Sequence, residues 1–164
     1  MIEQGAFQYL NDWHYLQLAR EHALQNRGMY DNPDMINATF CRLLAVQIVG
    51  SVEAMLQFNR DRFGEENYGV YFGRGTSNNR KIEILAVGIS NLWNQVDYEI
   101  ITDFIAIKII RNGIVHSREL ETNSEFLSLR QFPDNPNLLN ETHWNRMCIV
   151  YREMLRYLIG MTSI

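Results

Sequence analysis

The chain has 164 residues, of which 46% are hydrophobic and 21% charged, a composition typical of a soluble globular protein with one well-formed core. The net charge of −4 excludes a general nucleic-acid binder held by a broad positive field, so any bound nucleic acid would need a local basic patch. Cys41 and Cys148 fall within helical patterns and lack metal-ligand spacing. This pattern predicts two buried, reduced thiols and a cytoplasmic location.

No apolar run approaches the roughly 18 uncharged residues of a transmembrane helix, so we expect no membrane partner. The first residues, MIEQGAFQYLNDW, lack the basic and then apolar segments of a secretory signal. In chain order, apolar residues recur at three- and four-residue steps over 6–26, which predicts an amphipathic helix ending before Gly28. Asn32 then provides an N-cap with Pro33 at the first helical position, and the periodicity extends this second helix to about Phe63.

Residues 64–80, GEENYGVYFGRGTSNNR, break every periodicity, and we predict a loop with a short extended piece at residues 70–72. Helical periodicity returns at Lys81 and continues to Trp93. A second irregular loop is expected near residues 130–140. Asn140 then caps a closing helix that ends at Gly160.

The segment 97–116 has two possible structures. Asn112-Gly113 between β-branched runs is the strongest short-range signal for a β-hairpin. Isoleucines at helical spacing instead predict a helix, and a lone hairpin is marginal among helical neighbours. We predict a helix that is either the central helix of the bundle or one face of a dimer. The fold is then a single all-α domain over residues 1–164, a bundle of about five helices.

Three polar residues interrupt this apolar segment: Arg111, Asn112 and His116. On a helix, Asn112 and His116 share a face, whereas Arg111 and His116 are separated by about 140° around the axis and about 7.5 Å along it. A guanidinium fork can grip two phosphate oxygens, and an imidazole can transfer protons near neutral pH. These residue types point to phosphate chemistry.

The six residues Arg111-Asn112-Gly113-Ile114-Val115-His116, late in an all-helical chain, resemble the Arg-Asn-x-x-x-His signature of the HEPN superfamily. The resemblance implies a HEPN-like bundle of four or five helices that commonly dimerises. Many members are metal-independent endoribonucleases, often toxins or defence effectors. In the family, the arginine and histidine of both protomers line one cleft at the dimer interface.

Carried over, the resemblance implies that Arg111 and His116 are catalytic and that Asn112 orients the histidine or the phosphate. It implies a homodimer, an RNA substrate and an antitoxin protein as partners, with no cofactor or metal. An acidic residue on an earlier helix near the arginine is another family feature, for which Glu53 and Asp103 are both candidates. Some HEPN toxins carry a regulatory tyrosine two residues after the histidine, where this chain has Arg118.

Cleavage by the 2′-OH of RNA needs a base for that hydroxyl and an acid for the leaving oxygen, and two histidines related by a twofold axis can fill both roles. The arginines would stabilise the charge that builds on the phosphoryl oxygens. The alternative is a structural polar cluster in a catalytically inactive helical dimer that binds a protein or a nucleotide. An enzyme needs Arg111 and His116 exposed in a cleft, whereas a structural pair should be buried and fully hydrogen-bonded.

Further basic residues could guide an RNA backbone. Arg74, Arg80 and Lys81 lie close together before a helix N-terminus that Ser77 or Asn78 would cap, and Arg118 follows the motif. The alternative for Arg74, Arg80 and Lys81 is an ordinary solvated loop. The remaining histidines show no metal-ligand or catalytic spacing, and His143 is expected at the surface.

Overall fold

The computed structural model describes residues 2–29, 31–92 and 95–160. Within these ranges it contains nine α-helices, one short 3₁₀-helix and no strand, which confirms the all-α prediction. The expected number of about five helices is too low. Five helices have 13 or more residues, and the other four α-helices are shorter connecting elements.

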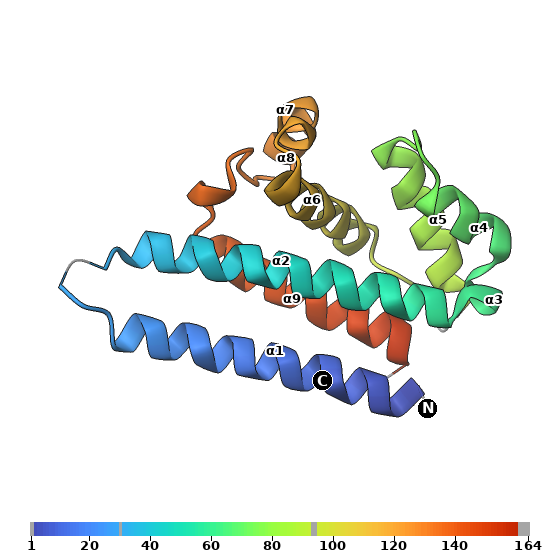
Figure 1. Cartoon of the computed structure of the whole chain (residues 1–164). Coiled ribbons are helices and arrows are strands. Elements are labelled where there is room, and N and C mark those ends of the chain that lie inside the picture. Colours follow the sequence, from blue (N-terminus) through green and yellow to red (C-terminus); the bar gives the residue numbers. More distant parts are fainter. Residues whose placement is uncertain (1, 30, 93–94, 161–164) are drawn as a thin grey trace.

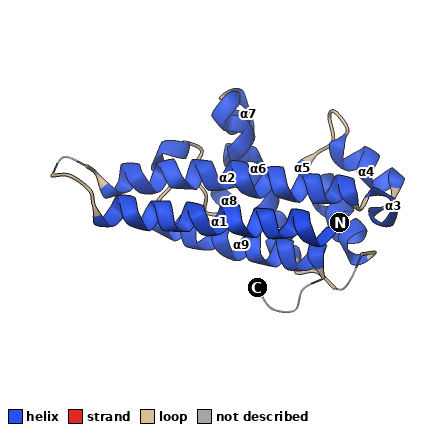
Figure 2. Ribbon diagram, turned by 60° about the horizontal axis from the view of Figure 1, so that its bottom comes forward, coloured by secondary structure: helices blue, strands red, loops and turns tan. Residues whose placement is uncertain are grey.

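Three long helices, α1 (Ile2–Gln25), α2 (Pro33–Phe58) and α9 (Glu141–Ile159), pack side by side and extend along the length of the molecule (Figures 1 and 2). Helix α6 (Tyr98–Val115) packs against α2 and α9, and α5 (Asn78–Ser90) packs against α6. The core lies between α2, α6 and α9, and its largest fully buried side chains include Leu44, Ile48, Phe104, Ile107 and Tyr151.

The helix ends follow the predicted capping chemistry. Asn32 accepts a hydrogen bond from the Asp34 N–H at 2.9 Å, with Pro33 in the first turn of α2. Asn140 caps α9 in the same way, and Gly160 ends it in the left-handed conformation with φ 72°. Of the two candidate caps of α5, the side chain of Ser77 is the one that accepts, from the Arg80 N–H.

The region 59–77 differs from the prediction. Helix α2 ends at Phe58, and two short helices follow, α3 (Arg60–Phe63) and α4 (Glu65–Phe72), separated by Gly64 at φ 102°. The predicted loop is wrong for residues 65–72, including the extended piece at 70–72, and for 78–80, where α5 begins; only Gly64 and residues 73–77 are irregular. The physical reason is tertiary: Tyr71 is buried, and α4 packs against α5, which offsets the weak helix propensity of its glycine and asparagine.

The predicted second loop also contains regular structure. Helices α7 (Arg118–Thr122) and α8 (Ser124–Leu129) precede it, and a 3₁₀-helix, η1, spans Pro136–Leu138. The helix predicted over 81–93 is α5, which begins at Asn78 and ends at Ser90. Its apolar residues Ile82, Leu85 and Ile89 are buried, as is Leu92 just beyond it, whereas Trp93 lies outside the described residues. Of the two thiols, Cys41 is buried and Cys148 is only half-buried, and both are free.

Helix α6 is continuous through Asn112 and Gly113, so the helical prediction is confirmed and the hairpin is excluded. Gly113 does not end the helix. Five isoleucines of α6, Ile101, Ile105, Ile107, Ile109 and Ile110, are at most 4% exposed within the single chain. The isoleucine excess therefore serves the central helix of this fold and provides no argument for a dimer.

By length and composition alone, α2 could cross a membrane, with a mean hydropathy of 1.5 in its most apolar window. Half of that window is buried among the other helices. A core helix of a water-soluble bundle has the same properties, and α2 contacts α1, α6 and α9.

Candidate active site

The candidate site lies at the C-terminal end of α6. Arg111 and Asn112 belong to the last two turns of this helix, and His116 is its C-cap. The His116 N–H donates to the Asn112 carbonyl at 2.8 Å, but the His116 backbone is extended, with φ −132° and ψ 92°. Because the backbone of His116 is not helical, its imidazole does not point where a helix would direct it. The separation of about 140° between Arg111 and His116, which assumes that both residues are helical, therefore does not describe this site.

The His116 side chain is exposed, and among the described residues it has no hydrogen-bond or ion-pair partner. Asn112 is half-buried, and no side-chain hydrogen bond within the described part of the chain joins it to His116. Within one chain, the described contacts therefore do not support the expected role of Asn112 in orienting the histidine side chain. An exposed imidazole without a partner is available for proton transfer.

Arg111 contacts Glu53 of α2, whose Oε2 lies 3.2 Å from Arg111 Nη2. The Arg111 side chain is 29% exposed, and its Nε is buried without a hydrogen-bond partner. A guanidinium has five N–H donors, and the described residues satisfy only one position. Arg111 and His116 are therefore neither fully buried nor fully hydrogen-bonded, whereas a purely structural polar cluster would be both.

Glu53 also accepts hydrogen bonds from two side chains, Lys108 and Tyr71, that the sequence analysis did not identify as site residues. Its Oε1 accepts from Lys108 Nζ at 2.6 Å and from the Tyr71 hydroxyl at 3.0 Å, while Lys108 Nζ lies 3.1 Å from the same hydroxyl. The ammonium of Lys108 also lies 4.1 Å from the centre of the Tyr71 ring. Helices α2, α4 and α6 thus converge on one carboxylate.

Burial shifts the pKa of two members of this cluster, Lys108 and Tyr71. Desolvation lowers the pKa of Lys108, while the neighbouring Glu53 carboxylate acts in the opposite direction. Burial, and next the negative charge of Glu53, raise the pKa of Tyr71 well above its usual range. The Tyr71 hydroxyl therefore stays protonated at neutral pH and donates to Glu53.

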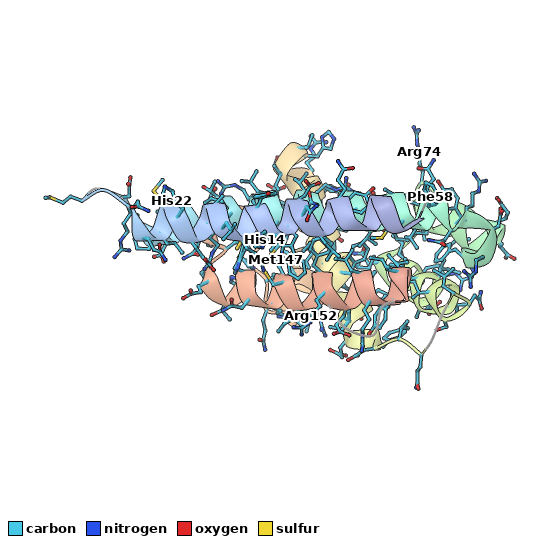
Figure 3. All side chains as sticks on the ribbon, turned by 90° about the horizontal axis from the view of Figure 1, so that it is seen from below. His14, His22, Phe58, Arg74, Met147 and Arg152 are labelled. Atoms are coloured by element: carbon cyan, nitrogen blue, oxygen red, sulfur yellow. The ribbon has the colours of Figure 1, made fainter. Side chains whose placement is uncertain are left out.

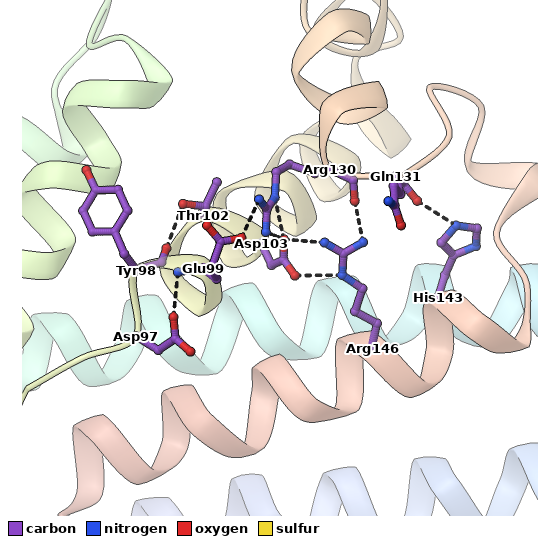
Figure 4. Close-up of polar contacts among 9 residues, drawn as sticks. All are labelled: Asp97, Tyr98, Glu99, Thr102, Asp103, Arg130, Gln131, His143 and Arg146. Atoms are coloured by element: carbon purple, nitrogen blue, oxygen red, sulfur yellow. Dashed lines mark hydrogen bonds and ion pairs between the residues drawn. The ribbon is translucent and has the colours of Figure 1, made fainter.

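The second acidic candidate, Asp103, lies in a different cluster (Figure 4). Its carboxylate accepts from Arg130 Nε at 2.8 Å and from Arg146 Nε at 2.7 Å, and in the described part of the chain no hydrogen bond or ion pair links it to Arg111. Asp103 is buried and joins α6 to α9 and to the end of α8. Geometry therefore favours Glu53 as the acidic neighbour of the arginine.

The predicted basic residues are dispersed. Lys81 lies close enough to Lys108 for its charge to lower the pKa of that ammonium, so α5 adds a cation near the cluster. Arg80 pairs with Glu83 at 3.0 Å, and both side chains are about half exposed. Arg74 extends into solvent from the 73–77 loop (Figure 3), and Arg118 is exposed at the start of α7.

A groove with a volume of about 530 Å³ lies beside the motif. Gly113 and Ile114 at the end of α6, Ser117 just after it and Arg42 of α2 are among the residues that line it. Neither Arg111 nor His116 is among its lining residues. In one chain, Arg111 and His116 therefore do not line this groove.

The missed residues differ in the signals that could have revealed them. Lys108 is a charge inside an otherwise apolar helix, three residues before Arg111 and thus on a neighbouring face, and this placement was a readable signal. Tyr71 had none, because its segment was predicted as a loop. His143 is half-buried, contrary to the predicted surface position: its Nδ1 accepts from the Asn140 N–H at 3.1 Å, and its Nε2 contacts the Gln131 carbonyl at 3.1 Å.

The described residues hold no group of three or more His, Cys, Asp or Glu side chains placed to bind a metal ion. Comparisons of this chain with protein-family models, with curated proteins and with solved structures find no match.

Proposed function

We propose that this protein is a metal-independent endoribonuclease of the HEPN type, acting as a toxin or defence effector in the cytoplasm. The observation that carries the proposal is the state of the motif: His116 is exposed without a partner, and Arg111 is held by Glu53 through one nitrogen with other donors unsatisfied. A purely structural pair would be buried and fully hydrogen-bonded.

In the proposed reaction, His116 of one protomer removes the proton from the 2′-OH, which attacks the adjacent phosphorus. The 5′ oxygen of the next nucleotide leaves and takes a proton from His116 of the second protomer. The products carry a 2′,3′-cyclic phosphate and a 5′-hydroxyl, and Arg111 stabilises the charge on the non-bridging oxygens.

This mechanism requires two copies of the chain. Exposed apolar side chains lie within the motif and on the helix packed against α6: Ile114 is 40% and Val115 72% exposed at the end of α6, and Leu43 and Val46 are exposed on α2. Such apolar surface beside a polar motif supports a twofold interface that would bring the two motifs into one cleft. In this arrangement Lys81 and Arg118 contact the RNA backbone, with Arg74 and Arg80 farther out. An antitoxin would act by covering the same cleft.

A digest of single-stranded and loop RNA in the presence of a chelator, with both product ends mapped, tests the chemistry. Unstacked RNA is the appropriate substrate because it can align the 2′-OH with the phosphate. We expect cyclic-phosphate ends in the wild type and none in His116→Ala. Cleavage that requires a metal ion, or that survives in His116→Ala, would exclude the mechanism.

Light scattering tests the dimer. Val115→Asp should yield a monomer and abolish cleavage, whereas Leu129→Asp, at an apolar residue of α8 that is 74% exposed, should leave both unchanged. A stable wild-type monomer at micromolar concentration would contradict the proposed site. An intact dimer that cleaves none of the tested RNAs would favour the inactive module that binds a protein or a nucleotide.

A further inference from the structure

The proposed chemistry uses Arg111 and His116 but leaves Lys108 without a role, although Lys108 is the more buried cation. Its side chain is 11% exposed, against 29% for Arg111, and both contact the same Glu53 carboxylate. Burying an ammonium is unfavourable unless it is paired. A second cation placed on one carboxylate therefore calls for an explanation beyond packing.

The two oxygens of Glu53 are used differently. Oε1 faces Lys108 and the Tyr71 hydroxyl, whereas the one partner of Oε2 within the described ranges is Arg111. Among the described residues Arg111 is contacted at 3.2 Å through Nη2 only, so Glu53 takes a single N–H and leaves both hydrogens of Nη1 and the second hydrogen of Nη2 for a phosphate. Lys108 and Tyr71 thus fix the orientation of the Glu53 carboxylate. In this orientation Glu53 holds Arg111 in place while most of its N–H donors stay unpaired.

The charges of the cluster lead to the same conclusion. Glu53 carries one negative charge, and Lys108 and Arg111 each carry one positive charge, so the three together have a net charge of +1. Without Lys108, Glu53 and Arg111 would form a neutral pair. A neutral, partly buried pair attracts an anion far less than an uncompensated guanidinium does.

We infer that Lys108 is a positioning residue for an anion site at Arg111: by neutralising Glu53, it leaves the Arg111 guanidinium free and positively charged toward a phosphate group. The inference rests on the proposed function, in which that phosphate is the scissile group of RNA. Tyr71 assists by donating its hydroxyl hydrogen to Glu53 and accepting one from Lys108.

Binding of inorganic phosphate, followed without RNA, tests the charge balance directly. The probe is the Nε–H resonance of Arg111 in a nitrogen–proton NMR spectrum, identified by its absence in Arg111→Lys. In the wild type, phosphate titration should shift this resonance. Lys108→Met, which keeps the chain length but not the charge, should weaken phosphate binding about tenfold or more. Lys108→Arg should retain it.

The decisive variant combines Lys108→Met with Glu53→Gln, which restores the net charge to +1 by removing the anion as well as the cation. We expect phosphate binding to recover toward the wild-type level. A merely structural role predicts the opposite, because the second substitution removes the charge that pairs with Arg111. Circular dichroism of each variant checks that the helices are intact, and Lys108→Gln, which also removes the charge, takes the place of Lys108→Met alone and in the double variant if Lys108→Met does not fold.

Phosphate binding in Lys108→Met equal to that of the wild type, or a double variant no better than Lys108→Met, would overturn the inference. So would a wild-type resonance that phosphate does not shift. A wild type that binds phosphate with the expected variant pattern but leaves every RNA intact would refute the ribonuclease proposal and leave the anion site standing.

Discussion

Leu120 of α7 occupies the space that a Cβ atom on Gly113 of α6 would need. A Cβ built on Gly113 would lie 2.2 Å from Leu120 Cγ and less than 3 Å from both of its methyl groups. Gly113 therefore allows α6 and α7 to approach each other closely, and the Asn-Gly pair forms no hairpin turn here. This contact turns the chain back directly after His116 and fixes the end of α6.

We expect Gly113→Ala to destabilise the fold. Alanine improves the helix propensity by about 1 kcal/mol, but overpacking against buried Leu120 costs about 1–3 kcal/mol and displaces α7. Gly50→Ala in α2 is the matched control, because nothing lies within 4 Å of a Cβ built there. It should leave the free energy of unfolding unchanged or raise it. Urea unfolding of both variants tests the difference.

Asp103 is the buried centre of the second ionic cluster, and its neutralisation should be costly. Asp103→Asn leaves the guanidiniums of Arg130 and Arg146 without their shared carboxylate. We expect a loss of about 2–4 kcal/mol in the free energy of unfolding, since both arginines keep some solvent contact. Glu99→Gln is the control: its side chain is 72% exposed and pairs with the same Arg130, so it should cost less than about 1 kcal/mol.

His143 should make stability depend on pH. Its burial lowers the pKa of the imidazole below its ordinary value, with the nearby positive charge of Arg146 acting in the same direction. The Nδ1 atom accepts from the Asn140 N–H, and a protonated imidazole could not accept. The folded state therefore favours the neutral ring.

The sign of the dependence follows from this preference. Above pH about 6.5 the ring is neutral in both the folded and the unfolded chain, and the stability is fully present. As the pH falls below that value, the unfolded chain binds the proton first, so stability declines until the pH passes the lowered pKa of the folded state. His143→Gln, which can still accept and donate, should flatten the decline between pH 7 and pH 5 in thermal unfolding. An unchanged slope would contradict this assignment.

Sequence periodicity predicted the long helices because each buries one regular stripe, and the caps at Asn32, Ser77 and Asn140 were readable for the same local reason. The helix at 65–72 was not predictable locally. Its glycine and asparagine oppose a helix, and the burial of Tyr71 against distant α2 and α6 stabilises it. The isoleucines of α6 showed that this helix is buried but not which surface covers it.

The same division applies to the candidate site. The motif residues could be named from spacing alone, but the choice between Glu53 and Asp103 depended on packing. Glu53 lies 58 positions from Arg111 in sequence and was brought to it by the pairing of α2 with α6. The position of His116 beyond the last helical residue also depended on tertiary structure, because Leu120 packing on Gly113 sets that end.

The ribonuclease proposal predicts a specific ranking of variants in RNA cleavage. His116→Ala removes the proton carrier and should reduce the rate about 100-fold or more. Arg111→Lys keeps the positive charge but loses the planar fork, so it should be nearly as damaging. His14→Ala is the matched control for the histidine, because His14 is exposed on α1, and α2 and α9 lie between α1 and α6, the helix of the motif (Figure 1).

Mixing the wild-type chain with His116→Ala tests whether one cleft needs both histidines. A heterodimer of the two retains one histidine in the shared cleft, whereas the wild type has two. If one histidine must act as base while the other acts as acid, such heterodimers should stay far below half of the wild-type rate, and activity should fall more steeply than the fraction of wild-type chain. Activity that falls in proportion to that fraction would instead indicate that each chain carries a complete site, and the twofold mechanism would then be wrong.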